Sequence, residues 1–204
     1  MRQVEVYLSE FKITVSADGQ IVRQIEDLSI GRAGHLTPMF EDGALSPREA
    51  LHISSKYPPP HGGAEMPFAL FFEKAGRADL AGCAFHQGDT FAPSHGCIHL
   101  NKADAQWLFN WAGSLPVRVS VHGPYPSSPV RAHIYEVGAA AMLPRVVRRI
   151  NERLSQLGLL SKTPDEIYDQ KTADAVRKFQ EQKGLAVDGK VGEHQTAGAL
   201  GLKL

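Results

Sequence analysis

The chain is poor in cysteine, in charge of one sign and in long apolar runs. It has only two cysteines, Cys83 and Cys97, too few for a framework of disulfides. Basic and acidic residues number 22 each, so no basic excess indicates a nucleic-acid partner and no acidic run indicates a disordered tail. No apolar stretch approaches the roughly 20 residues of a membrane span. The composition therefore predicts neither a nucleic-acid binder nor a membrane-spanning protein.

The first residues also lack an apolar leader. Residues 1–6 alternate between polar and apolar side chains, as a strand does, and show no signal-peptide pattern. We therefore expect one of three origins for the chain. It is cytoplasmic as made, it is a mature or trimmed form, or it is exported by a non-classical route.

The patterning divides the 204 residues into two domains. Over residues 1–122 apolar and polar side chains alternate, which predicts a mostly-β domain. Three prolines crowd the start of residues 123–141, which predicts a stiff linker there. Residues 142–204 carry apolar residues at helical spacing, which predicts a small all-α domain of three helices.

Within the first domain, local signals predict individual elements. Alternating or continuous apolar runs predict strands at residues 4–8, 11–15, 21–30, 67–72, 80–85 and 117–121. Asn101 can cap a helix that Gly113 would end. The stretch from His35 to Met66 is rich in Pro, Gly and His, and we interpret it as a long loop that forms part of a substrate cleft.

The strongest chemical signal is the segment Ser-His-Gly-Cys-Ile-His at residues 94–99. A thiol needs a neighbouring base or positive charge to become the nucleophilic thiolate. Cys97 has histidines close by on both sides in the sequence, and His86 lies eleven residues upstream. Gly96 leaves room for a substrate carbonyl or a tight bend, because it has no Cβ. The pattern predicts that Cys97 is reactive.

The second cysteine has a different setting. Cys83 lies in an apolar run, which favours a small buried hydrophobic residue. A disulfide between Cys83 and Cys97 is an alternative, and it would silence the nucleophile.

The segment at 94–97, with its histidine upstream, resembles the signature of the YkuD-type L,D-transpeptidases. Residues 31–38 (GRAGHLTP) resemble that family's glycine-rich stretch, and residues 66–72 (MPFALFF) resemble its strand before the upstream histidine. The resemblance covers most of residues 4–122. It implies an L,D-transpeptidase-like β-sandwich with one helix after the catalytic cysteine.

The resemblance also implies roles for individual residues. Cys97 is the implied nucleophile and His86 the implied general base and acid. Backbone amides around Gly96 are candidates for stabilising the oxyanion, and His95 and Ser94 would support the catalytic loop. Substrate binding is expected of four further residues: His99, Met66, Phe68 and Thr37. No metal ligand and no cofactor is expected.

Two departures from the family pattern concern substrate recognition. The loop from His86 to Cys97 is shorter than in most members, which alters the cleft. Members usually carry Arg two positions after the cysteine, where this chain has His99. Because Arg offers a fixed charged fork to a carboxylate and His does not, we expect a His99→Arg variant to keep or raise transpeptidation.

The C-terminal region carries a second resemblance. Phe-Gln at 179–180, Gly-Leu at 184–185, Val-Asp-Gly at 187–189 and Val-Gly at 191–192 resemble, in order and approximate spacing, a peptidoglycan-binding three-helix repeat. The alternative is that these residues are only core and turn positions of a small helical bundle. The resemblance implies that peptidoglycan, through its stem peptides and glycan, is the partner.

Together the resemblances imply a cysteine L,D-transpeptidase in the periplasm or cell envelope of a bacterium. It would act on tetrapeptide stems through a thioester acyl-enzyme, forming cross-links or exchanging the terminal D-amino acid. The acceptor stays open: another stem, a free D-amino acid, a protein lysine, or water, which would make the enzyme an L,D-carboxypeptidase.

Three other interpretations stay open. The same active site would serve a secreted toxin directed at the wall of a rival cell. A zinc peptidase would use His95, Cys97 and His99, which share a face if they lie on a strand, with His86 as a fourth ligand. A wall-binding protein with a degenerate site would have no activity.

Overall fold

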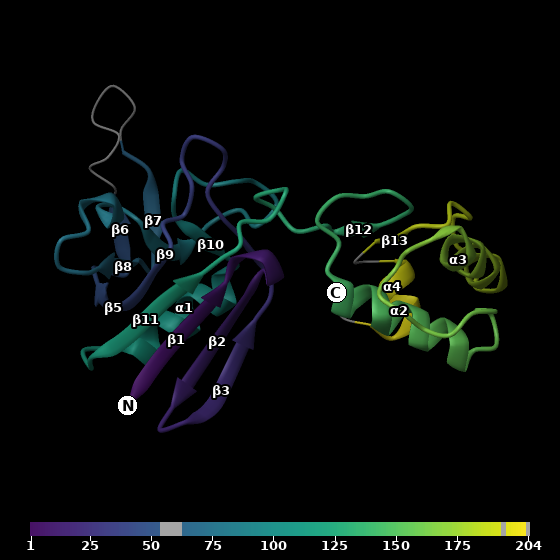
Figure 1. Cartoon of the computed structure of the whole chain (residues 1–204), viewed down its shortest axis with the longest axis horizontal. Helices are drawn as coiled ribbons and strands as arrows, with labels where there is room; N and C mark the ends of the chain where they lie inside the picture. The colour runs from purple at the N-terminus through teal and green to yellow at the C-terminus, as the bar shows by residue number, and fades with distance from the viewer. Residues whose placement is uncertain (54–62, 193–194, 203–204) are drawn as a thin grey trace. The chain divides into compact units, whose positions relative to one another are not determined.

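The computed structural model describes residues 1–53, 63–192 and 195–202. Contacts divide the chain into two compact units, Met1–Val130 and Arg131–Leu204 (Figure 1). The division falls inside the segment 123–141 that the sequence predicts to be a linker. Its first part belongs to the first unit, where the Ile30 N–H donates to the Pro129 carbonyl at 2.9 Å.

The first unit is built mainly of strands. Its elements are β1 (Arg2–Tyr7), β2 (Lys12–Ala17), β3 (Gln20–Ile25), β4 (Leu28–Ser29), β5 (Phe40–Pro47), β6 (Leu51–Ile53), β7 (Glu65–Pro67), β8 (Leu70–Glu73), β9 (Ala84–Gln87), β10 (Ile98–Leu100), α1 (Lys102–Ala112) and β11 (Val117–His122), with short 3-10 turns at Leu8–Glu10 and Ala78–Leu80. Among the described residues, nine strands form one mixed sheet in the order β3-β2-β1-β11-β5-β8-β9-β10-β4, and β6 pairs with β7.

The sheet forms because alternate residues of its strands are apolar and share one buried face. Val4 and Val6 of β1 pair in parallel register with Val119 and Val121 of β11, and none of the four is more than 2% exposed. The mostly-β prediction for this unit is therefore confirmed.

The sheet curls until its two ends approach each other. β3 and β4 lie at opposite ends of the strand order, yet only Glu26 and Asp27 separate them in the sequence. Three residue steps span at most about 11 Å, so the two ends must come within that distance. The curl places β10, the strand that follows Cys97, beside β4 at the point of closure.

The helix after the cysteine motif forms as the sequence predicts. The Asn101 side chain accepts a hydrogen bond from the Asp104 N–H at 3.0 Å, and Gly113 ends the helix at a φ of +52°. Its buried face, Ala105, Leu108 and Ala112, packs toward the sheet, and the helix contacts β9 and β5.

Three expected strands are shorter or interrupted. The strand expected at 80–85 begins only at Ala84, because a 3-10 turn ends at Leu80 and Gly82 has a φ of +77°. The strand expected at 67–72 breaks at Phe68, whose φ is +59°. The one expected at 21–30 divides into β3 and β4.

The long loop expected between His35 and Met66 contains strands. β5 lies within it and pairs with β11 and β8, and β6 pairs with β7. Distant partners stabilise these strands, and a local pattern rich in Pro and Gly does not reveal such partners. Residues 54–62 of this stretch lie outside the described residues.

The second unit is helical, as predicted. Its elements are β12 (Ile134–Tyr135), α2 (Pro144–Gln156), α3 (Gln170–Gln182), β13 (Val191–Gly192) and α4 (Thr196–Leu200). The apolar faces of α2 and α3 meet in a small core that includes Ile150, Leu154, Val176 and Phe179.

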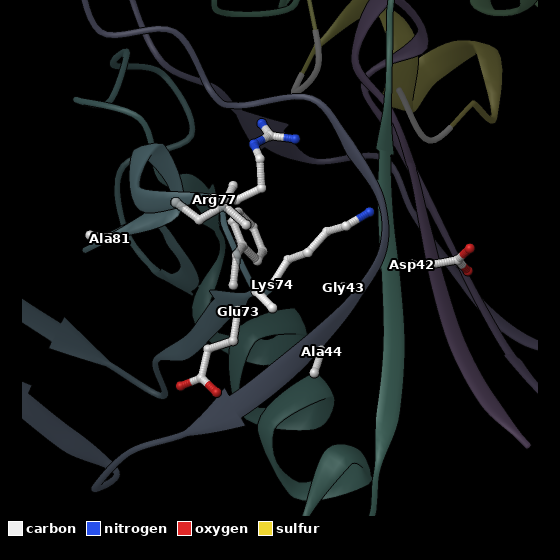
Figure 2. Close-up of a pocket in the computed structure, with 10 residues that line it drawn as sticks. Asp42, Gly43, Ala44, Glu73, Lys74, Arg77 and Ala81 are labelled. Carbon is white, nitrogen blue, oxygen red and sulfur yellow. The ribbon is translucent and has the colours of Figure 1, made fainter.

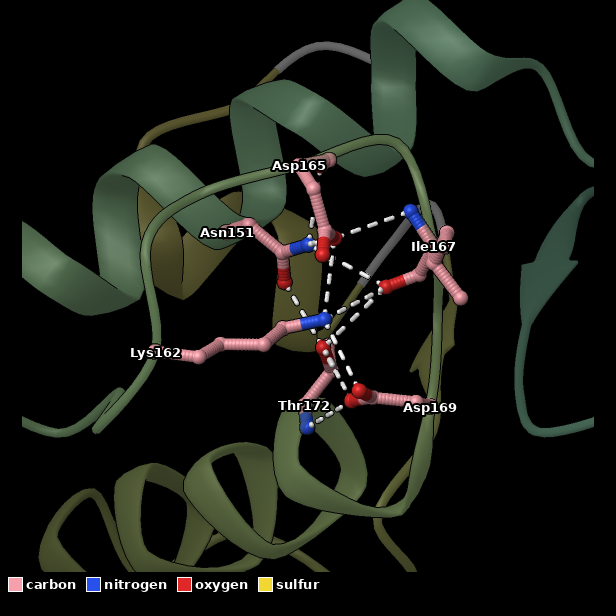
Figure 3. Close-up of polar contacts among 6 residues, drawn as sticks. All are labelled: Asn151, Lys162, Asp165, Ile167, Asp169 and Thr172. Atoms are coloured by element: carbon pink, nitrogen blue, oxygen red, sulfur yellow. Dashed lines mark hydrogen bonds and ion pairs between the residues drawn. The ribbon is translucent and has the colours of Figure 1, made fainter.

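A buried amide fixes the loop between α2 and α3 (Figure 3). Asn151 Nδ2 donates to the carbonyls of Asp165 and Ile167 at 3.0 and 3.2 Å. Its Oδ1 accepts from the Thr172 hydroxyl at 2.8 Å. Lys162 adds ion pairs to Asp165 and Asp169 at 2.9 and 3.0 Å. This loop is therefore held by polar contacts in addition to the burial of Leu160 and Tyr168.

The same device recurs in the next loop. Gln180 of α3 is 1% exposed, and its Nε2 donates to the Asp188 carboxylate and the Lys190 carbonyl at 2.8 and 3.0 Å. It also contacts the hydroxyl of Thr196, the first residue of α4, at 3.1 Å. Each loop that leads into α3 or α4 is thus held by an amide from the preceding helix. Over the residues described, no helix is both long enough and apolar enough to span a bilayer.

Candidate active site

Cys97 stands directly before β10 and is half-buried. Its Sγ lies 3.5 Å from the carbonyl oxygen of Gly82, and its side chain packs against the buried residues Met66, Ala69 and Ala84. Cys83 and Cys97 are both free thiols, so the alternative of a disulfide between them is not realised. Cys83 is buried, as its apolar surroundings in the sequence predict.

The glycine before Cys97 is required by backbone geometry. Gly96 has a φ of +113°, a conformation that residues with a Cβ rarely adopt. A Cβ at this position would lie 3.0 Å from Cys83 Sγ. The tight bend that presents Cys97 therefore depends on the absence of a side chain at residue 96.

Two buried hydroxyls hold the backbone carbonyl of Cys97. Ser94 Oγ donates to the Cys97 carbonyl oxygen at 2.5 Å and accepts from the Gly96 N–H at 3.1 Å. Thr37 Oγ1 contacts the same carbonyl at 3.3 Å and accepts from the Gly31 N–H at 2.9 Å. Ser94 is 2% exposed and Thr37 is 1% exposed, so both hydroxyls act on the backbone behind the nucleophile.

Tyr125 supports the same loop and was not anticipated from the sequence. Its hydroxyl donates to the Gly31 carbonyl at 2.5 Å and accepts from the Thr37 N–H at 3.1 Å. Burial raises the pKa of Tyr125, which keeps the hydroxyl protonated as a donor. A tyrosine between two prolines of an expected linker gives no local signal of this role.

His86 is a buried imidazole on β9. It is 7% exposed, and its Nδ1 lies 2.7 Å from the Gln87 carbonyl. Because a carbonyl only accepts, Nδ1 carries the proton and Nε2 is the basic nitrogen. Burial, reinforced by the neighbouring His99, lowers the pKa of His86 to about 4. The imidazole is therefore neutral at neutral pH and able to accept a proton.

The strand register places His86 close in the fold to the segment that carries Cys97. β9 and β10 run parallel, with Ile98 opposite Phe85 and His99 opposite His86. Register partners share a face of the sheet, and Cys97 directly precedes β10, two residues before His99. Cys97 packs against a cluster that includes Ala84 of β9.

His99 is packed against its neighbours. Its Nδ1 lies 3.1 Å from the Asp89 carbonyl and 3.3 Å from Ser29 Oγ. Its ring meets the His86 ring edge to face, and a Cβ on Gly88 would lie 2.6 Å from it. His99 therefore braces the turn after β9.

The exposed rim of the site lies on the loop that the sequence marks as glycine-rich. Arg32 Nη2 is 2.6 Å from His95 Nε2, and the rings of His35 and His95 have centroids 5.0 Å apart. Gly31 permits this loop to fold back, because a Cβ there would lie 2.7 Å from the Thr37 nitrogen. Sequence reasoning missed Arg32, since nothing local distinguishes it from a surface arginine.

The remaining predicted substrate residues lie at different depths. Met66 is 4% exposed and forms part of the floor against which Cys97 packs. The ring of Phe68 lies against Phe109 of α1, with centroids 6.0 Å apart. Substrate binding by Thr37, Met66 and Phe68 stays a prediction.

A pocket of about 740 Å³ opens beside β5 and β8 (Figure 2). Lys74 and Arg77 extend along it, and both are tied down, to the Glu41 and Met39 carbonyls respectively. Leu80 and Ala81 also line it, and they lead directly into Gly82, the residue whose carbonyl contacts Cys97 Sγ. The pocket thus borders the turn that holds the thiol.

The zinc alternative gains no support from this geometry. Within residues 1–53, 63–192 and 195–202, no three His, Cys, Asp or Glu side chains are grouped so that they could hold a metal ion. His99 Nδ1 faces a carbonyl instead of a shared centre with Cys97.

Among solved structures, the chain is similar to an L,D-transpeptidase from Stackebrandtia nassauensis, with 23% identity and a TM-score of 0.50 over 62% of this chain and 58% of that one. It is also similar to an L,D-transpeptidase from Mycobacterium smegmatis, with 21% identity and a TM-score of 0.48 over 60% and 58%. The first likeness shows a shared fold, and the chain spans less than two thirds of either structure. No curated protein matches the chain.

Family models assign both parts of the sequence. Residues 146–200 match the model of a peptidoglycan binding domain. Residues 1–131, more than half of the chain, match the model of the YkuD L,D-transpeptidase catalytic domain. The chain therefore belongs to the YkuD family of L,D-transpeptidase catalytic domains, followed by a peptidoglycan-binding domain.

Proposed function

We propose that this protein is a cysteine L,D-transpeptidase that acts on the tetrapeptide stems of peptidoglycan. The observation that carries the proposal is the parallel pairing of β9 and β10, which sets the buried, neutral imidazole of His86 opposite His99, two residues after Cys97. Membership of the family supports the substrate class.

In the first half of the reaction, His86 Nε2 takes the thiol proton, directly or through a water, as the thiolate forms. The Cys97 sulfur attacks the carbonyl carbon of the third residue of the stem. The C–N bond to the fourth residue then breaks, and His86 returns the proton to the leaving amine. The product is a thioester on Cys97, and one D-amino acid is released.

The second half transfers the acyl group. An acceptor amine attacks the thioester carbonyl, gives its proton to His86, and forms a new amide as the Cys97 sulfur leaves and is reprotonated. A second stem as acceptor yields a cross-link, and a free D-amino acid yields exchange. Water as acceptor yields a tripeptide, the L,D-carboxypeptidase reaction, with the same residues.

The loop geometry supplies the other requirement of acyl transfer. The positive φ of Gly96 and the hydroxyls of Ser94 and Thr37 fix the backbone around the nucleophile. The Gly96 N–H already donates to Ser94 Oγ, so we assign the oxyanion donor to the Cys97 N–H, which a backbone fixed in this way would present without reorganisation.

The second unit would hold the enzyme on its polymer. Binding to peptidoglycan raises the local concentration of stems without adding a catalytic contact. We place the protein in the bacterial cell envelope on this basis. An enzyme of the producing cell and a toxin delivered to a rival cell would share this chemistry. Expression in a host with and without an added export signal separates them, because a toxin should harm the host only when it is exported.

The test is digestion of purified disaccharide-tetrapeptide by the wild type, Cys97→Ala and Cys83→Ala, read by mass spectrometry. The wild type and Cys83→Ala should form dimers, exchange products or tripeptides, and Cys97→Ala should form none. The identity of the product names the acceptor. No product from the folded wild type, with retained binding to peptidoglycan sacculi, would favour the non-catalytic interpretation.

A further inference from the structure

The arginines of the first unit differ in what their guanidinium groups bind. Four of them pair with a carboxylate, at 2.5 to 3.4 Å: Arg23 with Asp104, Arg48 with Glu73, Arg77 with Asp79 and Arg118 with Asp42. Arg2 donates to the carbonyls of Trp111 and Ala112 at the end of α1. In the described part of the chain, the guanidinium of Arg32 has neither kind of partner, and its hydrogen bond goes to His95 Nε2 at 2.6 Å.

The backbone holds Arg32 beside the nucleophile loop. The Arg32 N–H donates to the Ser94 carbonyl at 3.1 Å, and Gly31 forms a parallel bridge with Ser94. The carbonyls of His35 and Leu36 approach Gly96, so the whole loop from Gly31 wraps around the segment that ends at Cys97. Arg32 is exposed at the rim of this arrangement.

The contact with His95 orients the guanidinium without neutralising it. An arginine only donates and is always charged, so His95 Nε2 must accept, and the His95 ring is neutral in this contact. A guanidinium has five N–H donors in a planar fork, and one such contact leaves others for a second partner. The result is a cation held in place by an uncharged ring, on a loop that is hydrogen-bonded to Ser94, three residues before Cys97.

His99 does not offer a comparable charge at the rim. Its ring is packed against His86, Gly88 and the Asp89 carbonyl. The exposed guanidinium on the loop that contacts Ser94 is that of Arg32.

We propose that Arg32 binds a carboxylate of the stem peptide and so determines which stems the enzyme accepts. The identity of the peptide rests on the proposed function. The attraction of an anion to this rim is independent of that function. A bidentate pair between guanidinium and carboxylate supplies both charge and geometry, which a lysine would not reproduce.

The first experiment needs no enzymatic activity. Rates of alkylation of Cys97 by iodoacetate, an anion, and by iodoacetamide, its neutral analogue, are measured at low salt by mass spectrometry of the Cys97 peptide. A change in the reactivity of the thiol alters both rates equally and therefore cancels in their ratio. Arg32→Gln should lower this ratio about two- to fivefold, the size expected for an exposed charge interaction, whereas Arg32→Lys should keep it.

The matched control is Arg118→Gln, on β11, because three strands separate β11 from β10 in the sheet. This variant should leave the ratio unchanged. An equal ratio in the wild type and in folded Arg32→Gln would overturn the proposal, as would an equal fall in Arg118→Gln. Arg32 is exposed, and circular dichroism of each variant verifies its fold.

The second experiment identifies the carboxylate. Tetrapeptide stems with a free or amidated terminal carboxylate, and with free or amidated side-chain carboxylates, are compared as donors. Arg32→Gln and Arg32→Lys should raise KM about tenfold for the donor with the recognised carboxylate and leave KM unchanged for its amide. An equal effect on free and amidated donors would overturn the proposal. A wild type that turns over no stem would count against the proposed function, and the alkylation ratio would still decide the role of Arg32.

Discussion

The imidazole rings of His86 and His99 lie edge to face, with centroids 4.9 Å apart, because the two residues are register partners in parallel strands. His99 acts on His86 electrostatically, and after burial it is the second cause of the lowered pKa of His86. The His99 ring thus adds to the effect of burial on the protonation state of His86.

The pH dependence of activity should reflect this arrangement. A general base must be neutral, and the pKa of His86 is about 4, so the acid limb of kcat/KM should fall near pH 4 rather than near 6.5. His99→Asn removes a group that lowers this pKa, so it should move the acid limb to higher pH. His122→Asn, at the far end of β11, is the control and should leave the limb in place. A wild-type limb near pH 6.5 would contradict the assignment of His86 as base.

Protein stability should depend on pH through the same residue. His86 has a pKa of about 4 when folded and 6.5 as its ordinary value, so between these pH values the unfolded chain binds more protons. Stability is then fully present above pH 6.5 and is lost as pH falls toward 4, by on the order of 3 kcal/mol. Urea unfolding of the wild type and His86→Gln at several pH values measures the difference. Parallel profiles for the two proteins would show that His86 does not contribute.

The Thr37 hydroxyl should matter to the nucleophile loop although it is buried. Thr37→Val leaves the Gly31 N–H without its acceptor and removes one contact from the Cys97 carbonyl, at a cost of about 1–3 kcal/mol. Thr37→Ser keeps the hydroxyl and should recover most of this stability. Thermal unfolding and the rate of Cys97 alkylation measure the two effects. If the valine and serine variants behave alike, the hydroxyl does not hold the loop.

Gly96 should tolerate alanine less well than Gly34 of the same unit. Both have a positive φ, but a Cβ at Gly34 meets nothing within 4 Å, whereas one at Gly96 meets Cys83 Sγ at 3.0 Å. Gly34→Ala should cost about 1–2 kcal/mol from backbone conformation alone. Gly96→Ala should cost about 3–4 kcal/mol and abolish activity. Equal losses of stability in denaturant unfolding would show that the contact with Cys83 is unimportant.

In the second unit, Asn151 should contribute far more than its neighbour Glu152. Asn151→Ala removes the buried amide that contacts the Asp165 carbonyl and the Thr172 hydroxyl (Figure 3), so we expect a loss of about 2–4 kcal/mol. Glu152 is exposed on the same helix, and Glu152→Ala should change stability by less than about 0.5 kcal/mol. Hydrogen exchange of the α2 and α3 amides reports on this unit alone. Unchanged protection in Asn151→Ala would contradict the role of the amide.

Local chemistry explains which elements the sequence could predict. Asn101 and Gly113 each act on the helix turn next to them, so both ends of α1 could be predicted from the local sequence. The cysteine motif at 94–97 is also contiguous, and its position before a helix follows from the same signals.

Other features depend on partners that are remote in the sequence. β5 forms because it pairs with β11 and β8, and its own composition does not predict a strand. Tyr125 and Thr37 lie 88 residues apart and meet at one hydrogen bond, which no spacing rule contains. Arg32 becomes distinctive only when the partners of the other arginines are known. The sequence thus identifies Cys97 and His86 as candidates, but not the residues that brace the loop around them.

The closure of the sheet has a consequence for the order in which the molecule assembles. The β1–β2 and β2–β3 pairs join neighbours in the sequence and are able to form early, whereas β4 and β10 are some 70 residues apart and pair late. Cys97 directly precedes β10, one of the two strands in this late-forming pair. A chain still folding, or one that opens locally at the seam, would keep its N-terminal meander while its cysteine is chemically ordinary. Reactivity of the thiol is then a reporter of complete folding.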